Sequence, residues 1–329
     1  MQVIQTFTPF PKPETYKSPT VLATKSNKVP KNIFTNLVVK KKLSDSRFPV
    51  FLVFSPDHNK LCALKLFPYR EDKINISYLN ESRYQYLSHP NVVPIIATTD
   101  KQISSCNNKK FKASCILMEF APYGDFATLI VQNKIYLDQT LVRTFFHQLV
   151  EGLEYIHSKQ ISHMDIKLEN LLLGEDFNLK ITDFDMSYKE GDFSFRGKGT
   201  ANYRAPELKH RKCEDAKAAD VYSAGIILFA LVTGAFPYIE KGLVEGHDLF
   251  DLLMKEYPRF WEIHQEFLKK KVSFSEDFKE LFKMMVKCDP NERATLEQVK
   301  KSAWYNGPIY TTEEVVTKLS QYKLINKKN

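Results

Sequence analysis

The stretch of sequence that decides the fold of this chain is His163-Met-Asp-Ile-Lys-Leu-Glu-Asn170, which runs directly into the apolar segment Leu171-Leu-Leu173. A second stretch, Ile181-Thr-Asp-Phe-Asp185, places Asp183 ten residues after Leu173. An aspartate, a lysine and an asparagine this close together can form a chemical site, but they can equally lie in a solvated loop. The segments on either side decide between the two.

Four further segments follow downstream. They are Gly199-Thr200, Ala205-Pro-Glu207, Asp220-Val-Tyr-Ser-Ala-Gly225 and Asp289-Pro-Asn-Glu-Arg293. In this order and spacing, the whole set resembles the catalytic domain of eukaryotic protein kinases, over about residues 35 to 305. The general resemblance is to the serine/threonine kinases of the calmodulin-dependent and AMP-activated type.

The resemblance implies roles for four polar side chains. Asp165 would accept the hydrogen bond of the substrate hydroxyl and take its proton, and Lys167 would steady the transferring phosphoryl group. A lysine at this position is typical of serine/threonine kinases rather than tyrosine kinases. Asn170 and Asp183 would supply oxygen ligands to Mg²⁺, which prefers them. The cofactors implied are ATP and Mg²⁺, and the partners are proteins that carry Ser or Thr.

The N-terminal part of the resemblance concerns the nucleotide. Leu61-Cys-Ala-Leu-Lys65 resembles the strand whose lysine holds the ATP phosphates, and we expect Glu81 to be the partner of Lys65. Glu81 stands eight residues before His89, one fewer than the family spacing, so a surface glutamate is the alternative. The resemblance also implies nucleotide contacts by two residues of the hinge segment, Glu119 and Ala121. Outside the hinge it implies contacts by Ala63, Asp125, Leu172, Leu43 and Phe51.

The phosphate-binding loop departs from the family pattern. The segment Leu43-Ser-Asp-Ser-Arg-Phe-Pro-Val-Phe51 has Ser44, Ser46 and Pro49 where the family has glycines. Glycine lets the backbone approach a phosphate and adopt a positive φ, whereas proline has no N–H to donate. We therefore expect weaker or slower use of ATP.

Two more departures affect the site and its control. Asp185 replaces the glycine of the metal-binding motif, which adds a negative charge at a position where aspartate tolerates left-handed backbone angles. Met164 replaces the arginine that normally pairs with a phosphate on the activation loop, so control by phosphorylation there is not expected. Ser194 and Thr200 are candidate phosphorylation sites, although Thr200 better suits a role in shaping the substrate site. Glu207 and Arg293 are expected to form a buried ion pair.

The apolar pattern predicts an α+β protein with two lobes. Short β-branched runs at 37–42, 50–54, 61–67, 92–98 and 113–120 predict a strand-rich small lobe over residues 35–119, with one helix at 76–88. After Gly124 the spacing becomes helical, which predicts a large lobe over 120–305. Residues 1–34 are expected to be a flexible extension. The tail, 306–329, contains Thr311 and Glu314 in the spacing of a helix capping box.

The bulk composition excludes several classes of protein. The five cysteines are odd in number and form no C-x-x-C pair, so neither a disulfide framework nor a zinc site is expected, and an intracellular, cytoplasmic location is. The net charge of +8 fits a polyanionic ligand or merely surplus surface lysine. No nucleic-acid partner is expected, because the runs Lys40–Lys42 and Lys269–Lys271 are short and lack aromatics. No membrane segment is expected, because the longest apolar run, Ala224–Phe236, suits a buried helix.

Two alternatives to an active protein kinase stay open. The altered phosphate loop favours a pseudokinase, a binding or scaffold module that has the fold without turnover. Retention of Lys65, Asp165, Lys167, Asn170 and Asp183 favours the enzyme. A kinase of small molecules is a third hypothesis, and it is disfavoured because 199–207 resembles a segment that positions peptides.

Overall fold

The computed structural model describes residues 34, 36–44, 46–70, 73–106, 109–132, 137–192, 199–210, 215–238, 248–268 and 274–322. The predictions for the N-terminal extension (apart from Phe34), for Ser194, for Lys269–Lys271 and for the last seven residues lie outside this range. The chain divides into two compact units. The first contains the described residues up to Pro122 together with Asp183–Asp185, and the second contains the remainder.

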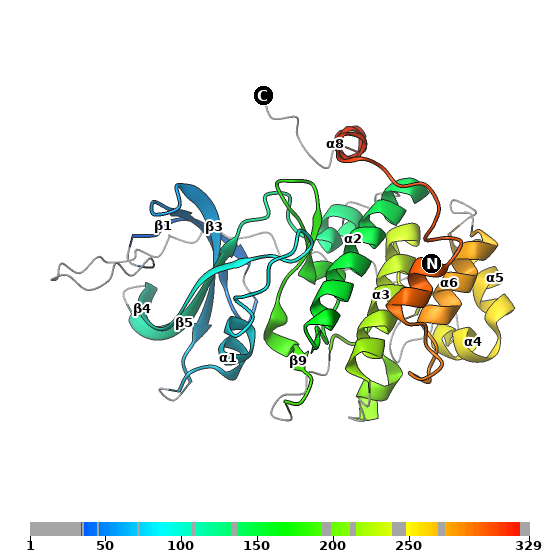
Figure 1. Ribbon diagram of the computed structural model, residues 1–329, viewed down its shortest axis with the longest axis horizontal. Coiled ribbons are helices and arrows are strands. Elements are labelled where there is room, and N and C mark those ends of the chain that lie inside the picture. Colours follow the sequence, from blue (N-terminus) through cyan, green and yellow to red (C-terminus); the bar gives the residue numbers. More distant parts are fainter. Residues whose placement is uncertain are drawn as a thin grey trace. The chain divides into compact units, whose positions relative to one another are not determined.

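A five-stranded antiparallel sheet forms the first unit (Figure 1). Its strands are β1 (Val38–Ser44), β2 (Val50–Ser55), β3 (Lys60–Pro68), β4 (Ile95–Cys106) and β5 (Lys109–Glu119), in the spatial order β1-β2-β3-β5-β4. These strands lie where the β-branched runs predicted them, and β4 and β5 extend further toward each other in the sequence. The strand-rich N-terminal region is therefore confirmed.

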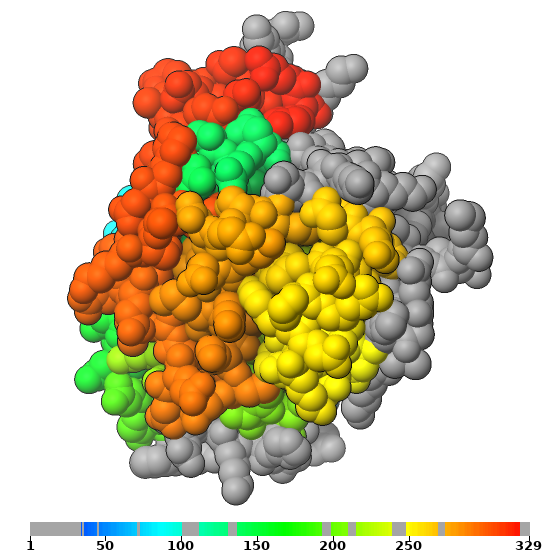
Figure 2. Space-filling view, turned by 90° about the vertical axis from the view of Figure 1, so that its right-hand side faces the viewer, coloured from blue at the N-terminus to red at the C-terminus, as the bar shows by residue number. Residues whose placement is uncertain are grey.

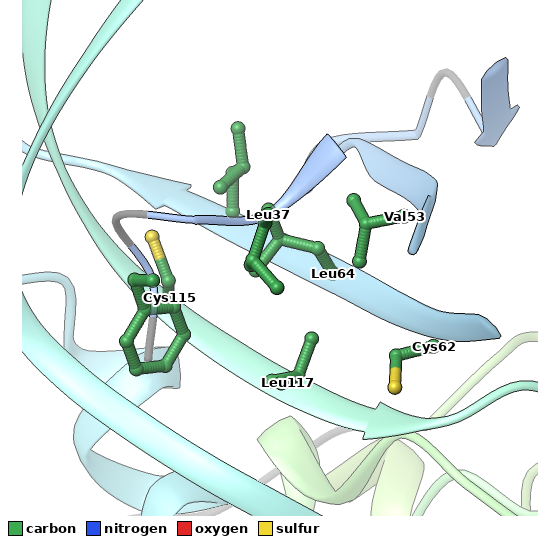
Figure 3. Close-up of a cluster of buried hydrophobic side chains, with 8 residues drawn as sticks. Leu37, Val53, Cys62, Leu64, Cys115 and Leu117 are labelled. Carbon is green, nitrogen blue, oxygen red and sulfur yellow. The ribbon is translucent and has the colours of Figure 1, made fainter. Parts of the chain in front are cut away.

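One face of this sheet is packed by a hydrophobic cluster (Figure 3). Its buried members are Phe34, Leu37, Val53, Cys62, Leu64, Leu66, Cys115 and Leu117. Because side chains alternate along a strand, the residues between them, such as Ala63 and Lys65 of β3, point to the other face. The sheet thus separates an apolar core from a face that can carry polar chemistry.

The helix of the first unit, α1 (Ile76–Ser82), is shorter than the predicted 76–88. It starts at Asn75, whose side chain accepts a hydrogen bond from the amide of Ser77 and so satisfies one of the unpaired donors of the first turn. After Ser82 the chain continues in turns. Glu81 lies on α1 itself, before these turns.

The second unit is helical, as predicted. Its helices are α2 (Gln139–Ser158), α3 (Ala216–Thr233), α4 (Leu249–Lys255), α5 (Tyr257–Phe267), α6 (Glu276–Met285), α7 (Leu296–Lys301) and α8 (Thr312–Gln321). Two small two-stranded antiparallel sheets pair β6 (Ile161–Ser162) with β9 (Tyr188–Lys189) and β7 (Leu171–Leu173) with β8 (Leu179–Ile181). The apolar face of α2 is fully buried, which confirms the periodicity seen in the sequence. The α+β class is thereby confirmed.

Helix α3 is the centre of the second unit. By length and composition it could cross a membrane, but most of its side chains are buried inside this unit, which is the pattern of a core helix. Gly225 allows close approach, since a Cβ there would lie 3.0 Å from the Cβ of Met285. Phe229, one turn further, packs in an aromatic cluster that includes Trp261 and Phe282.

The segment after α7 lies against α2. Arg143 of α2 donates to the carbonyls of Trp304 and Pro308, and Thr144 accepts a hydrogen bond from the amide of Tyr310. Helix α8 begins with the predicted capping box of Thr311 and Glu314. Figure 2 shows α8, in red, lying against the green start of α2, where Tyr322 bonds the residue that caps α2, Asp138. The tail is therefore an ordered part of this unit up to residue 322.

Glu207 and Arg293 form the expected buried ion pair. The guanidinium donates to both carboxylate oxygens of Glu207, at 2.8 and 3.0 Å, and to the carbonyl of Ala218 at 2.7 Å. The side chain of Arg293 is fully buried. Through these bonds, Arg293 joins the first turn of α3, at Ala218, to the segment that contains Glu207.

Breaking this pair from one side should be costly. In Glu207→Ala the buried guanidinium loses its counter-charge, so we expect a loss of roughly 3–5 kcal/mol in the free energy of unfolding. Urea denaturation followed by circular dichroism measures it. The control is Arg259→Ala, which removes an exposed pair with Glu262 and should change little. Equal effects of the two substitutions would contradict the structural role of the buried pair.

Candidate functional site

A closed hydrogen-bonded network in the second unit surrounds Asp165. Its carboxylate accepts from the ammonium of Lys167 at 2.6 Å and from the hydroxyl of Thr200 at 2.7 Å. The Lys167 ammonium also donates to the Thr200 hydroxyl, at 3.1 Å. Asp165 is almost fully buried, so its charge depends on these donors rather than on water. The structure thus brings together two predicted site residues and Thr200, for which a shaping role was expected.

The loop that carries Asp165 is held by a buried carboxylate from α3. Asp220 accepts from the backbone amides of His163 and Met164, at 2.7 and 2.8 Å, and from the ring of His157 at 2.9 Å. Met164 has a left-handed backbone with φ of 67°, and its side chain is buried. A left-handed methionine costs free energy, and the bond to Asp220 offsets part of that cost. The apolar residue at 164 is accordingly a packing residue here.

Asn170 ends a short 3₁₀ helix, η3 (Leu168–Asn170), beside the same loop. Its amide nitrogen donates to the backbone carbonyl of Asp165 at 2.9 Å. This bond fixes which way the amide group is turned. The atom of this side chain that could coordinate a cation is then its oxygen, which is the donor type that Mg²⁺ prefers.

The first unit contains a second charged cluster, centred on Lys65. Its ammonium donates to Glu81 of α1 at 2.5 Å and to Asp183 at 2.7 Å. The Lys65 and Glu81 side chains are nearly inaccessible, whereas Asp183 is 34% exposed. The predicted pairing of Lys65 with Glu81 is found, and the alternative of a surface glutamate is wrong. Asp183 retains the exposure that a ligand to a bound ion needs.

The acidic groups of this cluster outnumber its single ammonium, that of Lys65. Burial opposes the charged form of Lys65, but Asp183 and Glu81 outweigh it and raise the pKa of the lysine. Burial is also the largest effect on Glu81 and raises its pKa to about 8, with Lys65 acting in the opposite direction and Asp183 and Asp185 adding to the rise. We conclude that Lys65 is a stable cation and that Glu81 is the group of the pair that changes its protonation.

The Asp-Phe-Asp segment differs from expectation in its backbone. The residue with left-handed angles is Asp183, with φ of 68°, and Asp185 does not have a positive φ. Asp185 instead lies in a 3₁₀ helix, η4 (Phe184–Met186), and is buried. The aspartate that adopts left-handed angles is therefore Asp183, the predicted metal ligand. The replacement of glycine by Asp185 requires no unusual backbone in this conformation.

The glycine-free loop is folded onto the lysine. The ring of Phe48 is buried and packs at a tilt against Phe67, with centroids 4.7 Å apart. It lies 5.8 Å from the Lys65 ammonium. Two hydrogen bonds shape the loop: Ser46 donates from its hydroxyl to the carbonyl of Phe48, and from its amide to the hydroxyl of Ser44. In this arrangement a loop amide is bonded to a serine side chain, and an aromatic ring covers the lysine.

The register of the sheet places one predicted nucleotide contact on the face opposite Lys65. In β2 and β3, Phe51 pairs with Leu64, whereas Val50 pairs with Lys65. Phe51 packs against the hydrophobic cluster on the far face of the sheet, which favours a core role for it over the predicted contact with a nucleotide. Val50 has the orientation that Phe51 was expected to have. A one-residue shift reverses the face because the side chains of a strand alternate.

The remaining predicted nucleotide contacts fall in three places. Ala63 lies on the Lys65 face, paired with Met118 of β5, and Leu43 lies at an irregularity of β1, partly exposed. In the hinge segment, Glu119 donates its amide to the carbonyl of Pro94, and Ala121 is buried.

In the second unit, Asp125 and Leu172 form a backbone bridge. The carboxylate of Asp125 accepts from the amide and the hydroxyl of Thr128. The Asp125 carboxylate therefore satisfies the polar groups of Thr128, and its contact with the nucleotide stays a prediction.

The site residues predicted from the sequence did not include four residues that support the two clusters. Asn80 bonds the backbone of the Asp-Phe-Asp segment, and Phe48 lies over Lys65. Asp220 holds the loop that carries Asp165, and Val50 pairs with Lys65 in the sheet. Asp220 opens one of the segments that carry the resemblance, whereas the other three act through tertiary contacts and have only weak signals in the sequence.

Within the described part of the chain, no three or more His, Cys, Asp or Glu residues form a group that could hold a metal ion on their own. Asp183 and Asn170 therefore stay predicted ligands of Mg²⁺, each with the oxygen donor type that this cation prefers.

Comparison with known proteins identifies a matching family model and similar sequences. The model of the protein kinase domain family matches residues 48–305. CBL-interacting protein kinase 11 of Oryza sativa subsp. japonica is 31% identical over 228 residues, which cover 68% of this chain and 41% of the rice protein. Probable serine/threonine-protein kinase MARK-B of Dictyostelium discoideum is 36% identical over 194 residues, 58% of this chain and 26% of that protein. The chain spans less than half the length of both relatives.

The raised pKa of Glu81 predicts a pH-dependent stability. Its ordinary pKa is 4.5 and its pKa in the folded protein is about 8, so between these values the folded state binds more protons than the unfolded state. The contribution of Glu81 to the free energy of unfolding therefore falls as the pH rises from about 4.5 to about 8. Glu81→Gln lacks this titration and should gain stability relative to the parent chain across this window.

Urea denaturation of both proteins at several pH values between 5 and 8 measures the effect. A difference in stability that stays constant with pH would contradict the assignment.

Proposed function

Because the chain belongs to the protein kinase family, we propose that it is a serine/threonine protein kinase that transfers the γ-phosphoryl group of ATP, with Mg²⁺, to hydroxyls of protein substrates. The observation that carries the proposal is the network of Asp165, Lys167 and Thr200. A buried carboxylate bonded to a cation and to a hydroxyl is the arrangement that suits a group accepting a proton from a substrate alcohol.

In this proposal the substrate hydroxyl bonds Asp165, which takes its proton as the oxygen attacks the γ-phosphorus. The bond from the γ-phosphorus to the oxygen that bridges it to the β-phosphate breaks, and ADP leaves. Lys167, bonded to the same carboxylate, balances the negative charge that spreads over the phosphoryl oxygens. The proton stays on Asp165 until product leaves. Thr200 holds the second carboxylate oxygen, so Asp165 is presented in one orientation.

The Lys65 cluster would serve the nucleotide. The ammonium of Lys65, oriented by Glu81, would bind the α- and β-phosphates as in the family, and Ala63 and the hinge residues would contact the adenine. Asp183 and the oxygen of Asn170 would hold Mg²⁺, which neutralises phosphate charge when bound. The relatives' names as serine/threonine kinases support this substrate class.

A pseudokinase is the second candidate, and one observation favours it. Phe48 covers Lys65, and Ser44 occupies a backbone donor of the loop. Both features reduce what the loop can offer to phosphates. The retained polar network around Asp165 favours turnover.

The direct test is transfer of label from γ-labelled ATP to a basic protein substrate in the presence of Mg²⁺. We expect label on Ser or Thr with the parent chain. Asp165→Asn should lower the rate by roughly 10²- to 10⁴-fold, because it removes the proton acceptor while keeping the shape. Asp183→Asn is the second control and should abolish transfer that depends on Mg²⁺. Nucleotide binding without transfer by the parent chain would instead favour the pseudokinase.

The position of Phe48 predicts a gain of affinity. Phe48→Ala should uncover the Lys65 ammonium and strengthen ATP binding, roughly three- to tenfold, because the contact between ring and cation no longer competes. Titration calorimetry with Mg²⁺ and ATP measures the affinity. The matched control is Phe54→Ala, which removes a ring of the following strand, β2, that lies over Lys40 instead. Weaker binding in Phe48→Ala alone would show that the ring assists the nucleotide.

A further inference from the structure

Helix α1 and the residue pair that follows it contact the Asp183–Asp185 turn at three points. Glu81 shares the Lys65 ammonium with Asp183. The ring of Tyr84 lies 5.7 Å from the ring of Phe184. The third contact comes from Asn80, the residue before Glu81, which bonds the backbone of the turn itself. The first and second contacts follow from charge and from apolar packing, whereas the third has no counterpart among the site residues taken from the sequence.

The side chain of Asn80 is buried, and its amide nitrogen donates to two carbonyls of the turn. The distance to the carbonyl of Asp185 is 2.9 Å, and the distance to the carbonyl of Phe184 is 3.4 Å. The first is a normal hydrogen bond and the second is a weaker one. A buried polar group that loses such bonds is costly, so the side chain and the turn constrain each other.

The turn needs such a constraint for two reasons. Asp183 has a left-handed backbone, which is unfavourable for a residue other than glycine unless its surroundings hold it. Asp185 adds a buried negative charge close to Asp183 and Glu81, and like charges repel at short range. Both effects destabilise the turn in this conformation, and bonds to its backbone carbonyls oppose its rearrangement.

We propose that Asn80 is a positioning residue that clamps the Asp183–Asp185 turn to α1 and so holds the carboxylate of Asp183 against Lys65. The clamp acts from the helix that also carries Glu81, so one rigid element sets the positions of both partners of the lysine. That Asp183 is a ligand of Mg²⁺ rests on the proposed function, whereas the clamp itself does not.

A merely structural role for Asn80 would predict something different. If the residue only stabilised α1, its loss would resemble the loss of the helix cap. Asn75 provides this comparison, because it is a buried asparagine on the same helix whose side chain bonds the amide of Ser77. Asn75→Ala weakens α1, because the described bond of this side chain is made within the first turn of the helix and not to the Asp183–Asp185 turn.

The first measurement is hydrogen exchange by mass spectrometry on the nucleotide-free chain. In Asn80→Leu, which keeps the size and removes the donor, we expect exchange in a peptide covering residues 181–187 to accelerate by roughly tenfold. In Asn75→Ala the acceleration should instead be confined to the peptide that contains α1. Asn80→Asp is the second variant, in case the leucine prevents folding, and it should act in the same direction because it also lacks the donor.

The second measurement is the affinity for ADP with Mg²⁺ and with EDTA. The gain in affinity that Mg²⁺ provides should fall at least several-fold in Asn80→Leu, with the affinity in EDTA changed less. Unchanged exchange at 181–187 in both Asn80 variants, or equal acceleration there in Asn75→Ala, would overturn the clamp. Faster exchange in a chain that transfers no phosphate would uphold the clamp and contradict the proposed function.

Discussion

The first unit is organised around a single buried ammonium. Lys65 lies on the face of the sheet opposite the hydrophobic cluster, and a lysine in such a place is stable only if acids compensate its lost hydration. Glu81 and Asp183 do so, and this requirement fixes the rotation of α1 and the position of the Asp-Phe-Asp turn. The register of β2 and β3 follows the same constraint, because a slip of one residue would place Lys65 in the apolar cluster.

The second unit solves a similar problem with a buried carboxylate. Asp220, on the most buried helix, accepts from two consecutive amides of the loop that carries Asp165. This backbone support adds to the side-chain bond from Asn170 to the carbonyl of Asp165, and together they fix the loop that presents Asp165 and Lys167. Groups held in place in this way are what a preorganised site requires. It also allows Met164 to occupy a position where the family has a charged residue.

The departures from the family pattern have local physical consequences. In the phosphate loop, serine side chains bond the loop itself and Phe48 shields Lys65, so the loop is structured without glycine but offers less to a phosphate. In the metal motif, Asp185 adds charge, and Asn80 supplies bonds that retain the turn. The proposed kinase would thus bind its nucleotide weakly and hold Asp183, the proposed metal ligand, firmly in place.

The sequence by itself determined the class of fold, the order of the strands and helices along the chain, and the polar residues Lys65, Asp165, Lys167, Asn170 and Asp183, because each follows from short motifs and local periodicity. It also determined the helix cap at Thr311 and the pair of Glu207 and Arg293. The tertiary structure decided what depends on register and on packing between distant segments. Strand pairing placed Val50 rather than Phe51 on the face of Lys65, and the bonds of the turn placed the left-handed angles at Asp183 rather than Asp185. Phe48 and Asn80 owe their roles to neighbours far along the chain, to which local sequence carries no signal.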